Sequence, residues 1–211
     1  IRNPVASILS MAEVTNNAKT LKDAKERSAA LLKASKHLAR LTEQLLQYEK
    51  LQDAPIKFKT KRFDSFVETI AAGQTSLIFQ HGLNFEFKPA CGYTPLNFDP
   101  LLLQQVIENI IHNAIMHGGP DMTWIRVATF NRRTKIELVI SNNGKPIPAD
   151  KINMVFRRFV QAETSSGTNT GSGLGLAIVK EICKLHGGGV SVTSTNQETS
   201  FIMRFPMTIS H

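Results

Sequence analysis

Cysteine is scarce in this sequence: Cys91 and Cys183 are the only two among 211 residues. Two cysteines in a chain of this length are not a disulfide framework, so we expect reduced thiols and a cytoplasmic location. No stretch approaches the roughly 18 uninterrupted apolar residues of a membrane span. The first ten residues also lack the apolar core and cleavage site of a signal peptide. We therefore expect no membrane segment in this chain, while a membrane attachment of the parent protein stays open.

The sequence also lacks a tight basic cluster interleaved with aromatic residues, although its formal net charge is +8. A basic patch with such a charge is the electrostatic signature of nucleic-acid binding. Here the basic surplus is spread along the chain, both before and after residue 53. We interpret it as a solvated basic surface and expect no nucleic-acid partner. An acidic protein partner is the second use of such a surface.

Residues 1–53 have the pattern of a helical hairpin, with a short connection at "TNNAKT", residues 15–20. The second helix has apolar residues at alternating spacings of three and four: Leu31, Ala34, Leu38, Leu41, Leu45 and Tyr48. This is the a/d seam of a coiled coil, which needs partner helices. Two helices bury such a seam poorly alone, so we predict a homodimer with a four-helix bundle. The alternative is one long helix packed on its own domain.

After residue 53 the pattern changes. Pro55 stops the helix, and Ile56 and Phe58 alternate with lysines, so residues 54–62 are predicted to be a linker. Residues 63–211 mix helical and strand periodicity. We expect helices at 66–79, 99–117 and 175–186, a helical turn at 151–156, and strands at 83–88, 124–131, 135–141, 189–196 and 199–206. Helices segregated against a largely antiparallel sheet predict an α+β fold with a two-layer α/β sandwich.

The predicted helix at 99–117 contains "VIENIIHNAIMHG", residues 106–118, with apolar residues at helical spacing. Asn109 and Asn113 lie four residues apart, so their side chains share one face of the helix. A buried asparagine without hydrogen-bond partners is costly, and it is not a good helix former. The spacing alone leaves open why one face of this helix carries two carboxamides.

Glycines introduce the predicted helix at 175–186. Gly171, Gly173 and Gly175 follow a long Ser, Thr and Gly-rich stretch, and such a backbone can approach a phosphate at a helix N-terminus. The sequence lacks the GK[ST] of a P-loop, and the polar stretch is not the strand that a dinucleotide fingerprint needs. A different kind of nucleotide pocket is predicted, with a flexible hinge as the alternative. In "VISNNGKPIP" a strand ends before an Asn-Gly turn, where Asn142 is placed to contact a base edge, although an ordinary turn is the simpler interpretation.

In this order the motifs resemble the cytoplasmic core of sensor histidine kinases. "ENIIHNAIMHG" is similar to the N box, "NNGKPIP" to the first glycine box, "VFRRF" to the F box and "GSGLGLAIVKEICKLHGG" to the second glycine box. Residues 1–53 resemble the dimerisation and phosphotransfer hairpin, and residues 63–211 the catalytic domain. The resemblance covers essentially the whole chain. It implies a Bergerat-type ATP-binding fold and an ATP-dependent protein histidine kinase.

The resemblance also implies the ligands, which are ATP and Mg²⁺. Asn113 matches the asparagine that binds Mg²⁺, a hard cation for which an amide oxygen is suited. Asn109 matches the place where related ATPases hold a glutamate that activates water. A carboxamide is a poor base there, which favours phosphoryl transfer over hydrolysis. The remaining residues that the resemblance assigns to nucleotide binding are His117, Asn142, Gly144, Ile147, Phe159, Gly171, Ser172, Gly173, Leu174 and Gly175.

The phosphoacceptor histidine is absent from the sequence. "IRNP" matches the end of the phosphoacceptor box, which would place the histidine two positions before Ile1. Asn3 then matches the residue that orients a water for dephosphorylation of the partner, a response-regulator receiver. We therefore expect autophosphorylation, transfer to a receiver aspartate, and a phosphatase activity through Asn3.

Three positions depart from the family pattern. Asn142 replaces an aspartate that accepts a hydrogen bond from adenine, and loss of charge assistance there would weaken binding by about 1 kcal/mol, roughly fivefold. Pro146 replaces a glycine. Met116 replaces a lysine near the phosphates, for which Lys180, Arg157 or Arg158 would have to compensate. The alternatives are a degenerate kinase that only binds partners and an ATPase of the same fold.

Overall fold

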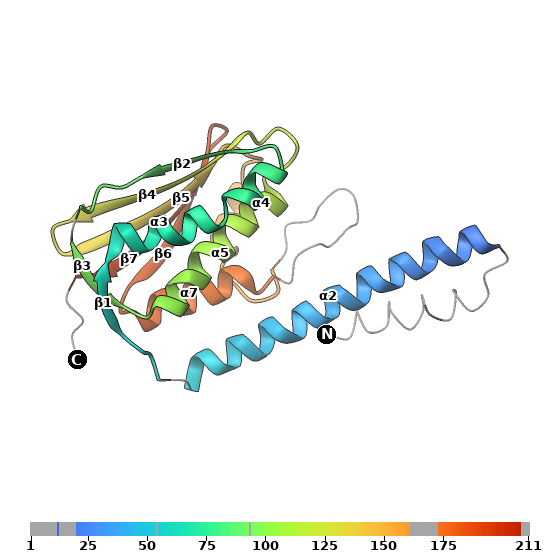
Figure 1. Cartoon of the computed structure of the whole chain (residues 1–211), viewed down its shortest axis with the longest axis horizontal. Helices are drawn as coiled ribbons and strands as arrows, with labels where there is room; N and C mark the ends of the chain where they lie inside the picture. The colour runs from blue at the N-terminus through green and yellow to red at the C-terminus, as the bar shows by residue number, and fades with distance from the viewer. Residues whose placement is uncertain (1–11, 13–19, 54, 93, 161–172, 208–211) are drawn as a thin grey trace.

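The main sheet has helices on one face (Figure 1). The computed structural model describes residues 12, 20–53, 55–92, 94–160 and 173–207. The five strands are, in spatial order, β2 (Asn84–Lys88), β4 (Trp124–Arg132), β5 (Lys135–Asn142), β7 (Thr199–Pro206) and β6 (Gly189–Ser194). β2 is parallel to β4, and the other neighbours are antiparallel. The predicted α+β class with a largely antiparallel sheet is confirmed.

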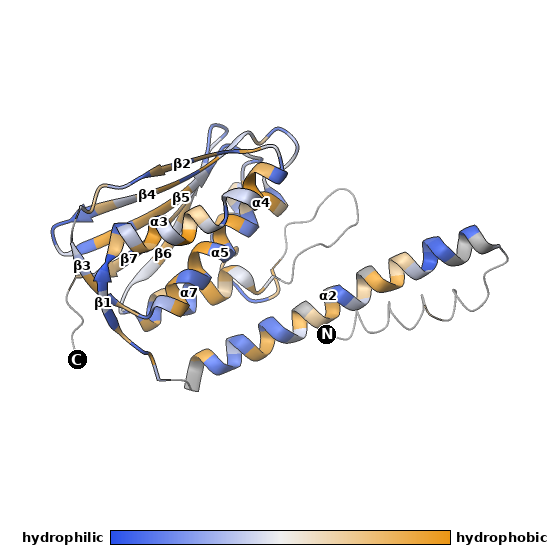
Figure 2. Ribbon diagram, in the orientation of Figure 1, coloured by the Kyte–Doolittle hydropathy of each residue, from blue (hydrophilic) through white to orange (hydrophobic). Residues whose placement is uncertain are grey.

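The helical layer consists of α3 (Phe63–Gly73), α5 (Pro100–His117) and α7 (Gly175–Leu185), with the short helices α4 (Thr75–Gln80) and α6 (Ala149–Ile152) beside it. Alternate residues of β5 are buried: Ile136, Leu138 and Ile140. Because side chains alternate across a strand, these three face the same way. Figure 2 shows apolar residues in both the strands and the helices that cover them. The core therefore lies between the sheet and the helical layer.

The helix predicted at 66–79 is two helices in the structure. Gly73 ends α3, and the backbone N–H of Gln74 bonds to the carbonyls at the end of that helix before α4 begins. Glycine disfavours a helix interior because it loses the most backbone freedom. The prediction weighted the apolar periodicity and neglected this break.

A second, two-stranded sheet joins the predicted linker to the domain. β1 (Lys59–Arg62) pairs antiparallel with β3 (Pro95–Phe98). The backbone N–H of Lys57 donates to the Asp99 carboxylate at 2.8 Å. Residues 59–62 were predicted to be part of the linker, and in the structure they form a strand. The domain boundaries themselves stay predictions.

Helix α2 (Leu21–Asp53) is one continuous helix that passes the α7 side of the domain (Figure 1). Tyr48 and Leu51, near its C-terminal end, are buried and belong to the same apolar cluster as the domain core. Leu32 and Leu46 are exposed. The first helix of the predicted hairpin lies outside the described residues, so the dimeric bundle stays a prediction. No described helix has the length and apolar character that crossing a membrane requires.

Candidate functional site

Helix α5 positions the two asparagines. Asp99 caps its N-terminus by accepting hydrogen bonds from the backbone of Leu101 and Leu102, which fixes where the helix begins. One face of α5 is buried in the core, and Asn109 and Asn113 lie beside that face, half-buried. The Asn109 Nδ2 atom is buried and has no hydrogen-bond partner among the residues that the structure describes. A buried donor without a partner costs about 1–3 kcal/mol, which a ligand with a suitable acceptor would relieve.

The unpartnered Asn109 side chain is adjacent to the beginning of α7. A Cβ atom added to Gly175 would lie 3.6 Å from Asn109 Oδ1. The first backbone N–H groups of a helix lack partners inside the helix, and the dipole there favours an anion. The Asn109 amide and a helix N-terminus therefore meet between α5 and α7, with the amide oxygen nearest to Gly175. This arrangement is suited to a phosphate group.

The turn after β5 closes on the end of α5. Lys145 N–H donates to the Gly118 carbonyl at 2.6 Å. A Cβ on Gly144 would overlap the Gly118 backbone, including its Cα at 2.5 Å. Gly144 is therefore needed for the close approach of two backbones. Its predicted place at the site is consistent with this contact, although its contact with a nucleotide stays a prediction.

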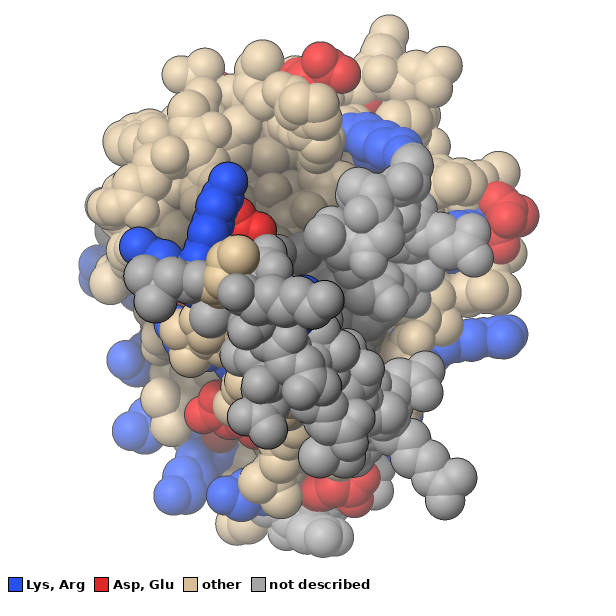
Figure 3. Space-filling view, turned by 90° about the vertical axis from the view of Figure 1, so that its right-hand side faces the viewer, with Lys and Arg blue, Asp and Glu red and all other residues tan. Residues whose placement is uncertain are grey.

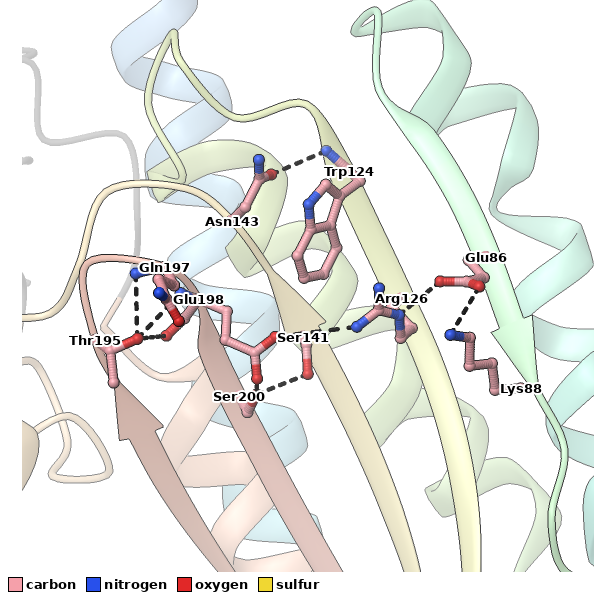
Figure 4. Close-up of polar contacts among 10 residues, drawn as sticks. All are labelled: Glu86, Lys88, Trp124, Arg126, Ser141, Asn143, Thr195, Gln197, Glu198 and Ser200. Atoms are coloured by element: carbon pink, nitrogen blue, oxygen red, sulfur yellow. Dashed lines mark hydrogen bonds and ion pairs between the residues drawn. The ribbon is translucent and has the colours of Figure 1, made fainter.

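The adjacent asparagines Asn142 and Asn143 have different surroundings. Asn143 Oδ1 accepts from the backbone N–H of Thr123 and of Trp124, both at 3.0 Å, and its Nδ2 donates to the Thr123 hydroxyl (Figure 4). Asn143 thus fastens the turn to the start of β4. Asn142 is buried at the end of β5 on the Ile140 side, the side that the helices cover. Of the two, Asn142 is the one that faces the helical layer.

Two further contacts hold the edges of the site. Ile147 N–H donates to the Ser194 hydroxyl at 2.8 Å, which ties the turn after β5 to β6. Phe159 N–H donates to the Gly173 carbonyl at 2.9 Å. Phe159 has φ +61° and Gly173 has φ +68°. Positive φ is ordinary for glycine but strained for an aromatic residue, and such strain clusters at functional segments.

The described side chains that the resemblance assigns to the site carry no positive charge. His117 is half-buried, and burial lowers the pKa of its imidazole, which favours the neutral form. Met116, at the place where a lysine was expected, is 37% exposed. On the face in Figure 3, lysines and arginines are scattered with acidic residues between them. Compensating charge for a polyphosphate must therefore come from a metal ion or from a side chain outside the assigned set.

The structure thus brings Asn109 to Gly175 and Phe159 to Gly173, and it places Asn142, Gly144 and Ile147 around the turn after β5. Asn3, Gly171 and Ser172 lie outside the described residues. Leu174 is buried at the beginning of α7. Sequence reasoning missed Gly118, Asn143 and Ser194, which hold the turn in place. Of these three, only Gly118 had a signal in the sequence, because it belongs to the glycine pair at residues 118–119 that follows the asparagine helix.

The comparisons with known proteins agree with this geometry. Residues 98–209 match the family described as Histidine kinase-, DNA gyrase B-, and HSP90-like ATPase. Because the match spans more than half of the chain, the chain belongs to that family. Within it, the probable sensor histidine kinase TcrY of Mycobacterium tuberculosis is 29% identical over 98% of this chain and 44% of its own length. The predicted resemblance to a sensor histidine kinase core with an ATP-binding domain is therefore confirmed.

Solved structures show the same fold along nearly the whole chain. Histidine kinase ThkA, solved in complex with the response regulator TrrA, matches with a TM-score of 0.78 at 20% identity, over 98% of this chain and 58% of that chain. Full-length ShkA, solved in complex with AMPPNP, matches with a TM-score of 0.72 at 21% identity, over 100% of this chain and 44% of that chain. The chain spans less than half the length of the curated relatives TcrY, YvrG and SilS.

Proposed function

We propose that this chain binds ATP with Mg²⁺ between α5, α7 and the turn after β5, and that it is the catalytic core of a kinase that phosphorylates its own histidine. The observation that carries the proposal is the buried Asn109 amide, which has no partner and faces the beginning of α7. A phosphate oxygen would supply the missing acceptor. The AMPPNP complex of the structural neighbour ShkA supports a nucleotide as the ligand.

Each residue of the site would have its own role in binding ATP and Mg²⁺. The Asn113 amide oxygen would hold Mg²⁺, since hard oxygen ligands and phosphates are what this ion prefers. Backbone N–H groups from Gly173 to Gly175 would hold the phosphates, and Asn142 would accept from the adenine amine. Neutral His117 would line the pocket. When bound, ATP would supply the phosphoryl group and Mg²⁺ would offset its charge, so the chain would contribute mainly position and electrostatics.

The phosphoryl group would then pass to an aspartate of a response-regulator receiver. The complex of the neighbour ThkA with the response regulator TrrA supports a partner of this class. The helical hairpin would form the homodimer and the docking surface, in a cytoplasmic location. Asn3 would orient the water for the phosphatase reaction. An Asn3→Ala variant that dephosphorylates the receiver at the normal rate would remove that role.

Calorimetric titration with a non-hydrolysable ATP analogue, with and without Mg²⁺, tests the proposal. We expect magnesium-dependent binding that Asn113→Ala weakens at least tenfold, since the metal would lose its protein ligand. Asn97→Ala, which alters an asparagine of β3 away from the site, is the matched control and should bind normally. No binding at millimolar analogue would instead favour the degenerate kinase.

A further inference from the structure

One contact joins the helical hairpin to the catalytic domain at the edge of the site. The Arg158 guanidinium donates to the Tyr48 hydroxyl at 2.7 Å and also lies 4.2 Å from the centre of the Tyr48 ring. Tyr48 is on α2 and only 4% exposed. The coiled-coil spacing predicts Tyr48 in the seam of the bundle, whereas the structure buries it against the domain. This side chain therefore connects the two regions.

Arg158 is directly bonded along the chain to the strained residue of the site. Its neighbour Phe159 has φ +61° and donates to the Gly173 carbonyl at 2.9 Å. Gly173 precedes the helix whose beginning faces Asn109. A change of side-chain torsions could thus carry the Arg158 guanidinium from Tyr48 towards the beginning of α7.

We propose that the Tyr48–Arg158 contact is a latch between α2 and the catalytic domain, and that nucleotide phosphates compete with Tyr48 for the Arg158 guanidinium. The inference rests on the proposed nucleotide binding. The assigned side chains of the site that the structure describes are uncharged, so a polyphosphate would gain from an arginine. A guanidinium bonds to phosphate in a charge-assisted, bidentate manner, which is stronger than its bond to a phenol.

The docked arrangement has features of a contact that can be released. Gln44, one helical turn before Tyr48 on α2, has a buried Oε1 atom with no hydrogen-bond partner in the structure. An acceptor without a partner among the described residues thus lies one helical turn from the latch. Beyond Tyr48, Leu51 is also buried in the apolar cluster of the domain, and the backbone N–H of Lys57 bonds to the Asp99 carboxylate. Movement of the domain after release of the latch would therefore also require Leu51 to leave the cluster, with residues 52–56 as the joint.

Thermodynamic linkage determines whether loss of the latch raises or lowers the affinity for nucleotide. If phosphates and Tyr48 compete for one guanidinium, nucleotide weakens docking, and loss of docking strengthens nucleotide binding by the same factor. Tyr48→Phe removes the hydroxyl and keeps the ring, so it should tighten the binding of the ATP analogue about threefold. Tyr48→Leu removes both contacts and should tighten it about tenfold. Arg158→Gln should weaken it about fivefold.

A double-mutant cycle measured by calorimetry tests the competition. Tyr48→Phe should have no effect on analogue affinity in the Arg158→Gln background, and neither variant should change the binding of adenosine, which has no phosphates. Unchanged affinity in Tyr48→Phe, or tightening that persists without Arg158, overturns the competition. If the wild-type chain binds no analogue at all, the proposed function fails first, and the latch is then judged by the distance measurement below.

Spin labels on the two regions test the latch without nucleotide. Ala29→Cys on α2 and Gln80→Cys on α4 are exposed positions, while the native Cys91 and Cys183 are buried and resist labelling. The labelled chain is mixed with an excess of unlabelled chain, so that a homodimer holds one labelled protomer. We then expect one narrow distance distribution in the otherwise wild-type chain and a broad one after Tyr48→Leu. Equal distributions in the two proteins would show that the contact does not hold the domain on α2.

Discussion

The polar groups on the two faces of the main sheet differ in how completely the chain satisfies them. On the face away from the helices, Arg126 bonds to Glu86 at 2.6 Å, Glu86 pairs with Lys88, and Ser141 bonds to Ser200 (Figure 4). On the helical side, half-buried Asn109 has a buried Nδ2 atom without a partner among the described residues. Folding alone explains the first arrangement. The second is costly for the free protein, and a ligand that accepts a hydrogen bond there would relieve that cost.

The two faces also differ in backbone conformation and packing. The outer face is built from ordinary strand residues in register, such as Ser141 opposite Ser200. The site is built from exceptions: two backbones in contact at Gly118 and Gly144, and an aromatic residue at positive φ. Such exceptions persist only where surrounding contacts enforce them. Substitutions at these positions should therefore disrupt the site most, while the residues of the outer face stay unchanged.

The largest effect is expected from Gly144→Ala. The new methyl group would overlap the Gly118 backbone, and overpacking of this kind costs about 3 kcal/mol. The free energy of unfolding in urea should fall by that amount, with loss of nucleotide binding. The matched control is Gly73→Ala, since nothing lies within 4 Å of a Cβ there. Gly73→Ala should be neutral or stabilising by about 0.5 kcal/mol. Equal losses in both variants would contradict the close approach at Gly144.

A pair of leucine substitutions compares a satisfied asparagine with an unsatisfied one. Asn143→Leu leaves the backbone N–H groups of Thr123 and Trp124 without their acceptor and should destabilise the chain by about 2 kcal/mol. Asn109→Leu removes a buried amide that has no partner, so it should stabilise the nucleotide-free chain by about 1 kcal/mol while abolishing nucleotide binding. Urea denaturation and calorimetry measure both. Destabilisation by Asn109→Leu would show that folding, not a ligand, requires this side chain.

Much of the fold followed from periodicity, because the asparagine helix and the two C-terminal strands have strong patterns. The outlines of α5, β5 and β7 were predicted to within a residue or two. The break at Gly73 was missed because an apolar face continues on both sides of it. The strand at residues 59–62 was missed because all four of its residues are polar and exposed. Such a strand has no alternation of apolar and polar residues by which it could be predicted.

The candidate site was predictable in its chemistry and not in its supports. Asn109 and Asn113 were recognisable because carboxamides interrupt an otherwise apolar helix. Asn143 was not, since an Asn-Gly turn is common and its bonds to β4 depend on tertiary structure. The Tyr48–Arg158 contact joins residues 110 positions apart, and the coiled-coil spacing assigned Tyr48 to a different partner. Spacing along one helix cannot show which of two surfaces a seam residue will meet.

The smallest effect is expected from Arg126→Gln on the outer face. Arg126 bonds to Glu86 and lies 4.6 Å from the centre of the Trp124 ring, but its side chain is 34% exposed, so water can replace these contacts. Exposed ion pairs contribute about 0–1 kcal/mol, and the unfolding free energy should change by no more than that. Trp124 is the only tryptophan, so its fluorescence reports this face directly. We expect altered fluorescence, nearly unchanged stability and unchanged nucleotide affinity. A loss of unfolding free energy as large as that of Asn143→Leu would show that the outer network stabilises the sheet. The two faces would then differ only in that the polar groups of one of them need a ligand.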